Sequence, residues 1–96
     1  MAEYRLSPAA RADLESIWRH TFDRWGIEQA ERYIDTLTQA FDDLAETPGI
    51  ARTCDNIRQG YRRFVVEKHT VYFRITRWGI SIIRVLHVKM DAPRHL

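Results

Sequence analysis

The chain has a single cysteine, Cys54, and no long apolar run among its 96 residues. One cysteine excludes an intrachain disulfide, which suits a reducing cytosol. No Cys–His pair or metal-ligand spacing surrounds Cys54, so we interpret it as an ordinary small side chain. The first residues, MAEYRLSPAARADLE, contain no apolar stretch, so neither a signal peptide nor a membrane span is expected. These absences predict a cytoplasmic protein with no membrane partner, no metal and no cofactor.

The sequence also has no internal repeat, no low-complexity segment and no linker, which predicts one domain over residues 1–96. Apolar residues make up 45% of the chain and aromatic residues 11%. That composition is sufficient for a modest core and argues against disorder.

Charge is unevenly distributed, although the net charge is only +2. Residues 1–49 hold five Lys or Arg and ten Asp or Glu, whereas residues 50–96 hold ten and three. An acidic half joined to a basic half indicates a surface for an anionic or acidic partner, unless the two halves neutralise each other within the fold.

The first half of the chain predicts a short strand followed by a helix hairpin. EYRLS alternates apolar and polar residues, and Ser7 and Pro8 are typical of a helix start. Apolar residues keep helical spacing up to Trp25, where Gly26 ends the first helix. A second helix begins at once and ends at Thr47–Gly49, so the two helices must be antiparallel.

The second half predicts a loop over residues 50–60 and then strands at Tyr61–Val66, Thr70–Thr76 and Ile80–Val88. The links EKH and RWG are short, which favours an antiparallel meander. The predicted class is α+β, in the order β-α-α-β-β-β.

The last strand is apolar on both sides. Alternation places Ile80, Ile82 and Leu86 on one side, and Ile83 and Val85 on the other. The helix hairpin can cover only one face of the sheet, so we expect the C-terminal tail or a partner chain to cover the rest.

Four segments in order, YRLSPAARADLESIW, WGIEQAERYIDTL, NIRQGYRRFVVEKHTVYFRI and IIRVLHVKMD, resemble the ParE toxins of the RelE/ParE superfamily, also called plasmid stabilisation proteins. The resemblance covers nearly the whole chain. It implies a helix hairpin on a small twisted antiparallel sheet. It also implies a partner encoded beside the toxin, a ParD-like antitoxin that binds operator DNA through a ribbon-helix-helix part. ParE-type members are described as inhibitors of DNA gyrase, whereas RelE-type relatives cleave mRNA on the ribosome.

The alternative of RNA cleavage needs a base, an acid and cations around the phosphate. RelE-like sites use strand Arg and Lys residues with a Tyr or His near the C-terminus. In this sequence the corresponding catalytic set would be His87, Arg84, Arg74 and Lys89. Three observations weaken this hypothesis. No tyrosine follows Tyr72. The family resemblance places an LH pair at His87 in chains regarded as non-nucleases. Arg74 and Arg84 are also suited to snorkelling or to pairing with the acidic helices.

The other hypothesis is protein binding, because Arg and aromatic residues dominate interface energetics. The predicted antitoxin-binding residues are Trp18, Phe22, Trp25, Arg62, Arg63, Arg74 and Arg84. Helical spacing favours Trp18 and Phe22 as core residues, but partial exposure would make them a groove for an amphipathic antitoxin helix. The predicted gyrase-facing residues are Arg84, His87, Lys89 and Met90. The sequence therefore favours a non-enzymatic gyrase inhibitor, with the ribonuclease, or an antitoxin-binding chain without toxicity, as alternatives.

Overall fold

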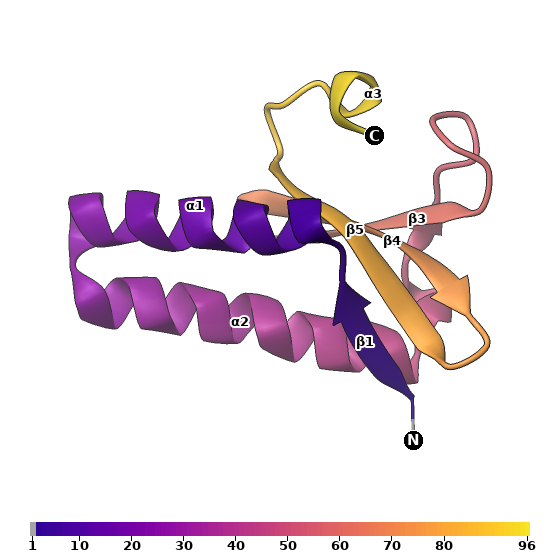
Figure 1. Ribbon diagram of the computed structural model, residues 1–96, viewed down its shortest axis with the longest axis horizontal. Coiled ribbons are helices and arrows are strands. Elements are labelled where there is room, and N and C mark those ends of the chain that lie inside the picture. Colours follow the sequence, from indigo (N-terminus) through magenta and orange to yellow (C-terminus); the bar gives the residue numbers. More distant parts are fainter. Residues whose placement is uncertain (1) are drawn as a thin grey trace.

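The computed structural model describes residues 2–96 and shows a helix hairpin on one face of a five-stranded sheet (Figure 1). In chain order the elements are β1 (Glu3–Leu6), α1 (Pro8–Trp25), α2 (Ile27–Glu46), the 3-10 helix η1 (Pro48–Ile50), β2 (Arg52–Thr53), β3 (Tyr61–Val66), β4 (His69–Thr76), β5 (Gly79–His87) and α3 (Ala92–His95). The predicted α+β arrangement is confirmed. The structure adds η1 at the start of the expected loop, β2 inside it, and α3 in the tail. No helix in the described part of the chain is long and apolar enough to cross a membrane.

The sheet has the strand order β1-β5-β4-β3-β2. The predicted meander of β3, β4 and β5 is antiparallel, but β1 pairs with β5 in parallel, which makes the sheet mixed. In Figure 1, α1 and α2 lie side by side and extend beyond one end of the sheet. The prediction of one domain over residues 1–96 stays a prediction, and Met1 lies outside the described residues.

The first helix begins where its sequence predicts. Ser7 is the N-cap, its Oγ accepts a hydrogen bond from the Ala10 amide at 2.9 Å, and Pro8 occupies the first turn. The Ser7 amide donates to the Ile82 carbonyl at 3.0 Å, and its hydroxyl donates to the Ile83 carbonyl at 2.7 Å. Ser7 therefore both starts α1 and fixes it against β5.

The main core lies between the helix hairpin and the sheet. Its fully buried members include Leu37 and Phe41 from α2, Phe73 from β4, and Ile80 and Ile82 from β5. Burial of such side chains contributes about 1.5–3 kcal/mol each.

A β-bulge changes which side chains of β5 reach this core. Tyr72 lies opposite Arg84, but Phe73 lies opposite Ile82, so Ile83 is the extra residue. Beyond the bulge the alternation is inverted: Val85 joins the main core, and Leu86 packs with Tyr72 on the other face. The predicted grouping of Leu86 with Ile80 and Ile82 is wrong for this reason, because strict alternation assumes a strand without an extra residue.

The opposite face of the sheet is covered by the C-terminal tail. Leu86 and Tyr72 form a second buried cluster with Cys54 and Ala92, and Leu96 packs against it. The tail is tied down by Arg58, whose Nη2 donates to the Leu96 backbone oxygen at 2.6 Å. The sequence predicts that either the C-terminal tail or a partner chain covers this face, and the structure shows the tail in that position. Burial also raises the pKa of the Cys54 thiol, which fits its interpretation as an ordinary small side chain.

Candidate functional site

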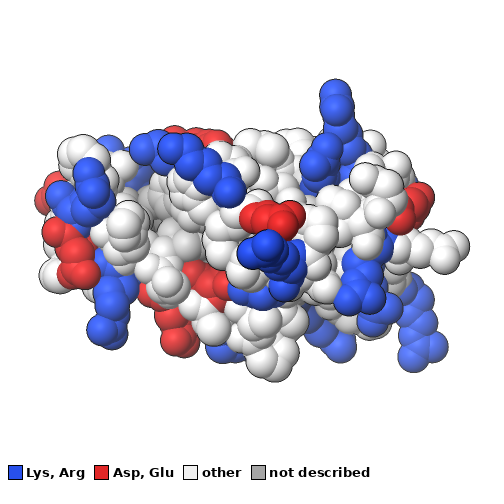
Figure 2. Space-filling view, turned by 90° about the horizontal axis from the view of Figure 1, so that it is seen from above, with Lys and Arg blue, Asp and Glu red and all other residues white. Residues whose placement is uncertain are grey.

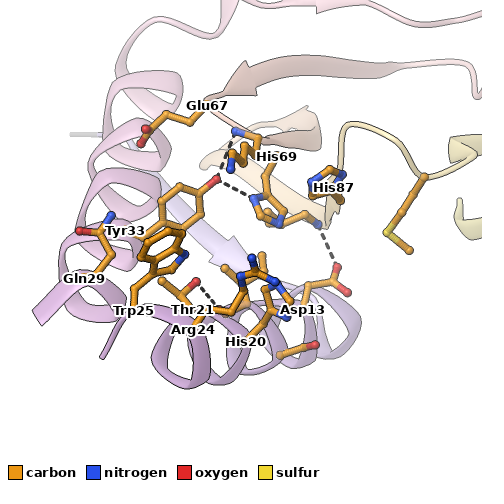
Figure 3. Close-up of a pocket in the computed structure, with 15 residues that line it drawn as sticks. Asp13, His20, Thr21, Arg24, Trp25, Gln29, Tyr33, Glu67, His69 and His87 are labelled. Atoms are coloured by element: carbon orange, nitrogen blue, oxygen red, sulfur yellow. Dashed lines mark hydrogen bonds between the residues drawn. The ribbon is translucent and has the colours of Figure 1, made fainter. Parts of the chain in front are cut away.

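A cleft of about 810 Å³ opens where the helix hairpin extends past the sheet. Figure 3 shows side chains from α1, α2, the β3–β4 turn and β5 surrounding it. Its lining is Asp13, Ser16, Ile17, His20, Thr21, Arg24, Trp25, Gln29, Tyr33, Glu67, Lys68, His69, Val85, His87 and Met90. The cleft combines apolar walls with titratable groups, as ligand and peptide sites commonly do.

A chain of polar groups crosses the cleft from α2 to β5 (Figure 3). The Tyr33 hydroxyl lies 2.6 Å from His69 Nδ1 and accepts a hydrogen bond from the Lys68 amide at 3.3 Å. The rings of His69 and His87 lie 5.4 Å apart, edge to face. Burial, helped by His87, lowers the pKa of His69 to about 4, so this imidazole is neutral at pH 7. Burial also raises the pKa of Tyr33.

Asp13 and Arg84 form a bidentate ion pair beside this chain. Arg84 Nε and Nη2 each donate to an Asp13 carboxylate oxygen at 2.8 Å. The Val85 amide donates to the same carboxylate at 2.9 Å, and Arg84 Nη1 donates to the His95 carbonyl at 3.1 Å. The hydrogen bonds that Arg84 donates to the Asp13 carboxylate raise the pKa of Arg84. Arg84 therefore joins α1, β5 and the tail.

The four residues of the hypothetical nuclease set do not share one site. His87 lies opposite His69 on the helix-facing side of the sheet, whereas Arg84 lies opposite Tyr72 and is bound to Asp13. Arg74 is exposed and alternates onto the Tyr72 side, and Lys89 is exposed beyond the end of β5. Two histidines and a tyrosine come together instead.

The predicted antitoxin-binding residues occupy several surfaces. Trp18 stacks on Phe22 with ring centroids 5.1 Å apart, and Phe22 is 42% exposed. Trp25 is 67% exposed and lines the cleft. Neither Trp18 nor Phe22 belongs to the core clusters, so the expectation that both are core residues is wrong. Both are partly exposed, which is the condition for a groove that an antitoxin helix could use.

The four predicted arginines are likewise separated. Arg62 donates to the Ala51 carbonyl at 3.0 Å and lies opposite Phe73, on the helix-facing side. Arg63 and Arg74 are exposed on the other side, while Arg84 is paired internally. Of the predicted gyrase-facing residues, His87 and Met90 line the cleft.

Sequence reasoning missed Asp13 and Tyr33 as parts of the site. Tyr33 keeps the helical apolar spacing of α2, which conceals its polar hydroxyl, and nothing local distinguishes Asp13 from the other acidic residues of the helices. In the described part of the chain, no three His, Cys, Asp or Glu side chains form a group that could hold a metal ion.

Comparison with known proteins identifies the family. Residues 4–92 match the family described as "ParE toxin of type II toxin-antitoxin system, parDE". The chain belongs to the ParE toxin family. This ParE-family chain is 50% identical over 96 residues to Toxin ParE1 of Mycobacterium tuberculosis, covering 99% of the chain and 98% of that relative. It is 44% identical to Toxin ParE1 of Caulobacter vibrioides, covering 100% and 99%, and 34% identical to Toxin ParE of Escherichia coli, covering 100% and 94%.

The ParE-type fold is supported by a solved structure described as "Chromosomal ParDE TA system from P. aeruginosa". Its TM-score is 0.80 at 22% sequence identity, covering 93% of this chain and 98% of that one. The predicted resemblance is therefore confirmed. Membership in a two-component toxin–antitoxin family implies an antitoxin partner for this ParE-family chain.

Proposed function

We propose that this chain is a non-enzymatic toxin of the cytoplasm that inhibits DNA gyrase by protein binding and is neutralised by a ParD-like antitoxin. The observation that carries the proposal is the separation of the four residues that RNA cleavage would require. Arg84 is bound to Asp13, and His87 and Arg74 lie on opposite sides of the sheet. Acid–base cleavage needs these groups around one phosphate. Binding of a protein needs only a complementary surface.

We assign the antitoxin to the helix hairpin and the cleft. Phe22 and Trp25 are large and exposed there, and such side chains anchor amphipathic peptides. Replacing Trp25 by Ala should weaken antitoxin binding about tenfold or more. Ile75→Ala is the matched control, because Ile75 is 50% exposed but lies outside the cleft.

We assign gyrase to the basic end of the molecule. Figure 2 shows mostly basic side chains over the sheet end at the right, whereas acidic and basic side chains mix over the helix hairpin at the left. A surface of one sign attracts an acidic partner and makes association sensitive to salt. Arg74 near the end of β4 and Arg77 in the β4–β5 turn are exposed cations at this end, whereas the exposed Lys89 follows the opposite end of β5.

The test compares gyrase supercoiling and mRNA cleavage on translating ribosomes with one preparation of the toxin. We expect loss of supercoiling at toxin excess, recovery when the antitoxin is added first, and intact mRNA. Unchanged supercoiling together with cleaved mRNA would replace the proposal with a ribosome-dependent endoribonuclease. Normal growth of bacteria that accumulate soluble toxin without antitoxin would instead indicate a chain that has lost toxicity.

A further inference from the structure

His69 and His87 each use one ring nitrogen inside the protein. His69 Nδ1 lies 2.6 Å from the Tyr33 hydroxyl, and His87 Nδ1 accepts a hydrogen bond from the Lys89 amide at 3.1 Å. A backbone amide only donates, so the neutral His87 ring must carry its proton on Nε2. The hydrogen bond at Nδ1 therefore makes Nε2 of the neutral His87 ring a hydrogen-bond donor.

The same assignment holds for His69. The Tyr33 hydroxyl accepts from the Lys68 amide, which leaves its own proton free to donate to His69 Nδ1. A short distance of 2.6 Å fits an O–H donor to an imidazole lone pair. If His69 Nδ1 carried the proton, the Tyr33 hydroxyl hydrogen would have no acceptor among the described residues, so we assign the proton of neutral His69 to Nε2.

Neither Nε2 atom is fully enclosed by the protein. Within residues 2–96 neither has a hydrogen-bond partner, and neither is among the fully buried unpaired polar atoms, where only Thr76 Oγ1 occurs. Both rings line the cleft, with their centroids 5.4 Å apart (Figure 3). The cleft therefore contains two neighbouring N–H donors that lack an acceptor.

The charges around the pair favour an anion. Arg24 from α1 and Lys68 from the turn face the cleft, with the exposed His20 beside them. Asp13 is already occupied by Arg84 and the Val85 amide, which leaves Glu67 on the exposed turn as the remaining acid of the lining. A hydrogen bond from an N–H donor to a charged acceptor is about twice as strong as one between neutral groups.

The apolar walls of the cleft indicate which kind of molecule carries the anionic group. Ile17, Trp25, Val85 and Met90 contribute apolar surface to the same cleft. A free inorganic anion cannot use that surface, whereas a peptide with an acidic residue between apolar ones can.

We propose that His69 and His87 form a carboxylate-binding site for an acidic side chain of the antitoxin. The proposal rests on the antitoxin occupying the cleft, as proposed above. The two Nε2–H groups donate to the carboxylate while Tyr33 and the Lys89 amide hold the rings in place. Neutral rings suffice for these hydrogen bonds. A docked carboxylate would also favour the protonated imidazole, so binding should take up protons as the pH falls.

Two substitutions of His87 separate its two nitrogens. His87→Gln places an amide near the Nε2 position and can still donate into the cleft, whereas His87→Asn places an oxygen near Nδ1 and can still accept from the Lys89 amide. With the antitoxin co-expressed from the toxin's own operon as the probe, we expect Asn to weaken binding about 10- to 100-fold at pH 7.5. Gln should remain within about threefold of the wild type. Thermal stability should follow the opposite order, because only Asn keeps the backbone contact.

The acidic partner is then found by changing each antitoxin Asp or Glu to its amide. One such change should abolish the difference between the Asn and Gln toxins. Equal affinity of both toxins and the wild type would overturn the carboxylate site, while leaving gyrase inhibition and neutralisation untouched.

If the antitoxin does not bind even the wild-type toxin, the proposed function fails, and acetate decides the carboxylate site separately. Imidazole ¹⁵N NMR should show both rings as Nε2–H tautomers at pH 7.5, with a saturable shift on adding acetate but not on adding chloride. The absence of that shift, or the Nδ1–H tautomer at His87, would refute the site.

Discussion

Asp13 satisfies several donors where the edge of β5 is no longer paired. β1 pairs with β5 only from Gly79 to Ile82, so the later edge groups of β5 need other partners. Ser7 accounts for the carbonyls of Ile82 and Ile83, and Asp13 accepts from the Val85 amide as well as from Arg84. A single carboxylate thus stabilises the sheet edge and the ion pair together.

Replacing Asp13 separates these two contributions. Asp13→Asn keeps an oxygen for the Val85 amide but loses the ion pair, and should cost about 1–2 kcal/mol of unfolding free energy. Asp13→Ala leaves the Val85 amide and the Nε and Nη2 groups of Arg84 without their acceptor, and should cost about 2–4 kcal/mol. Urea unfolding measures both, with the exposed Glu15→Ala on the same helix as control, expected within about 0.5 kcal/mol of wild type. Equal losses for Asn and Ala would refute the role of the Val85 amide.

His69 should make the stability of the fold depend on pH. Its pKa is about 4 in the folded protein, against about 6.5 for an unperturbed histidine, so the unfolded chain binds more protons between these values. Its stabilising contribution is complete above pH 6.5 and is lost progressively as the pH falls toward 4, by up to about 1.4 kcal/mol per pH unit.

Urea unfolding from pH 7 to pH 4.5 tests this dependence. His69→Asn, which cannot ionise but retains an acceptor for Tyr33, should flatten the fall in stability. The His20→Asn variant, which changes an exposed histidine, should retain most of the fall in stability. Superimposable pH curves for wild type and His69→Asn would rule out the assignment.

The role of each polar residue in the site depends on partners that lie far away in the sequence. The sequence identified His87 and Arg84 as polar residues of a strand, and pairing with an acidic helix was one of its interpretations of Arg84. It could not select Asp13 from the acidic residues of the helices, because that choice depends on where β1 ends beside β5. Tyr33 keeps the apolar spacing of α2, yet its hydroxyl meets His69, 36 positions later.

At the scale of elements, β1 can join the sheet only because β5 begins with glycine. Gly79 has φ 151°, and a Cβ built there would lie 1.9 Å from the Glu3 carbonyl oxygen. The obstacle is backbone rather than a movable side chain, so it cannot be relieved without shifting β1.

We therefore expect Gly79→Ala to lower the unfolding free energy by more than about 2 kcal/mol and to increase hydrogen exchange in β1. Gly49→Ala is the matched control, because Gly49 has no atom within 4 Å of the added Cβ and lacks a positive φ. It should be neutral or stabilising by up to about 1 kcal/mol. Wild-type stability of Gly79→Ala would mean that β1 does not approach β5 as closely as described.

Local signals predicted most element boundaries because caps and turns are local. Ser7, Gly26 and the two short hairpin links fall where expected. The bulge at Ile83 could not be predicted, since Ile83 is as apolar as its neighbours and the extra residue is defined only by the register against β4. That one residue decides whether Val85 or Leu86 enters the main core.

At the scale of the whole molecule, the tail completes a second core that the helix hairpin cannot reach. Cys54, Tyr72 and Leu86 are nearly inaccessible, and Ala92 and Leu96 lie against them. Because β5 has apolar side chains on both sides, its sequence predicts that something covers the second face of the sheet. Which segment does so depends on the path of residues 91–96, whose sequence shows little periodicity. Arg58 and Arg84, far apart in the sequence, fix that path through the backbone oxygens of Leu96 and His95.

The accessibility of Cys54 reports whether this cover holds in solution. Leu96→Ser removes the apolar contact of the tail and should accelerate labelling of Cys54 by a thiol reagent at pH 8, as local opening of the tail becomes more frequent. Arg94→Ser is the control, because Arg94 is exposed and pairs only with the neighbouring Asp91, so it should label at the wild-type rate. In the wild type, labelling should be slow, since burial both shields the thiol and raises its pKa, which reduces the reactive thiolate. Rapid labelling of all three proteins would show that the tail leaves the sheet freely and that the second cluster does not contribute to the stable core.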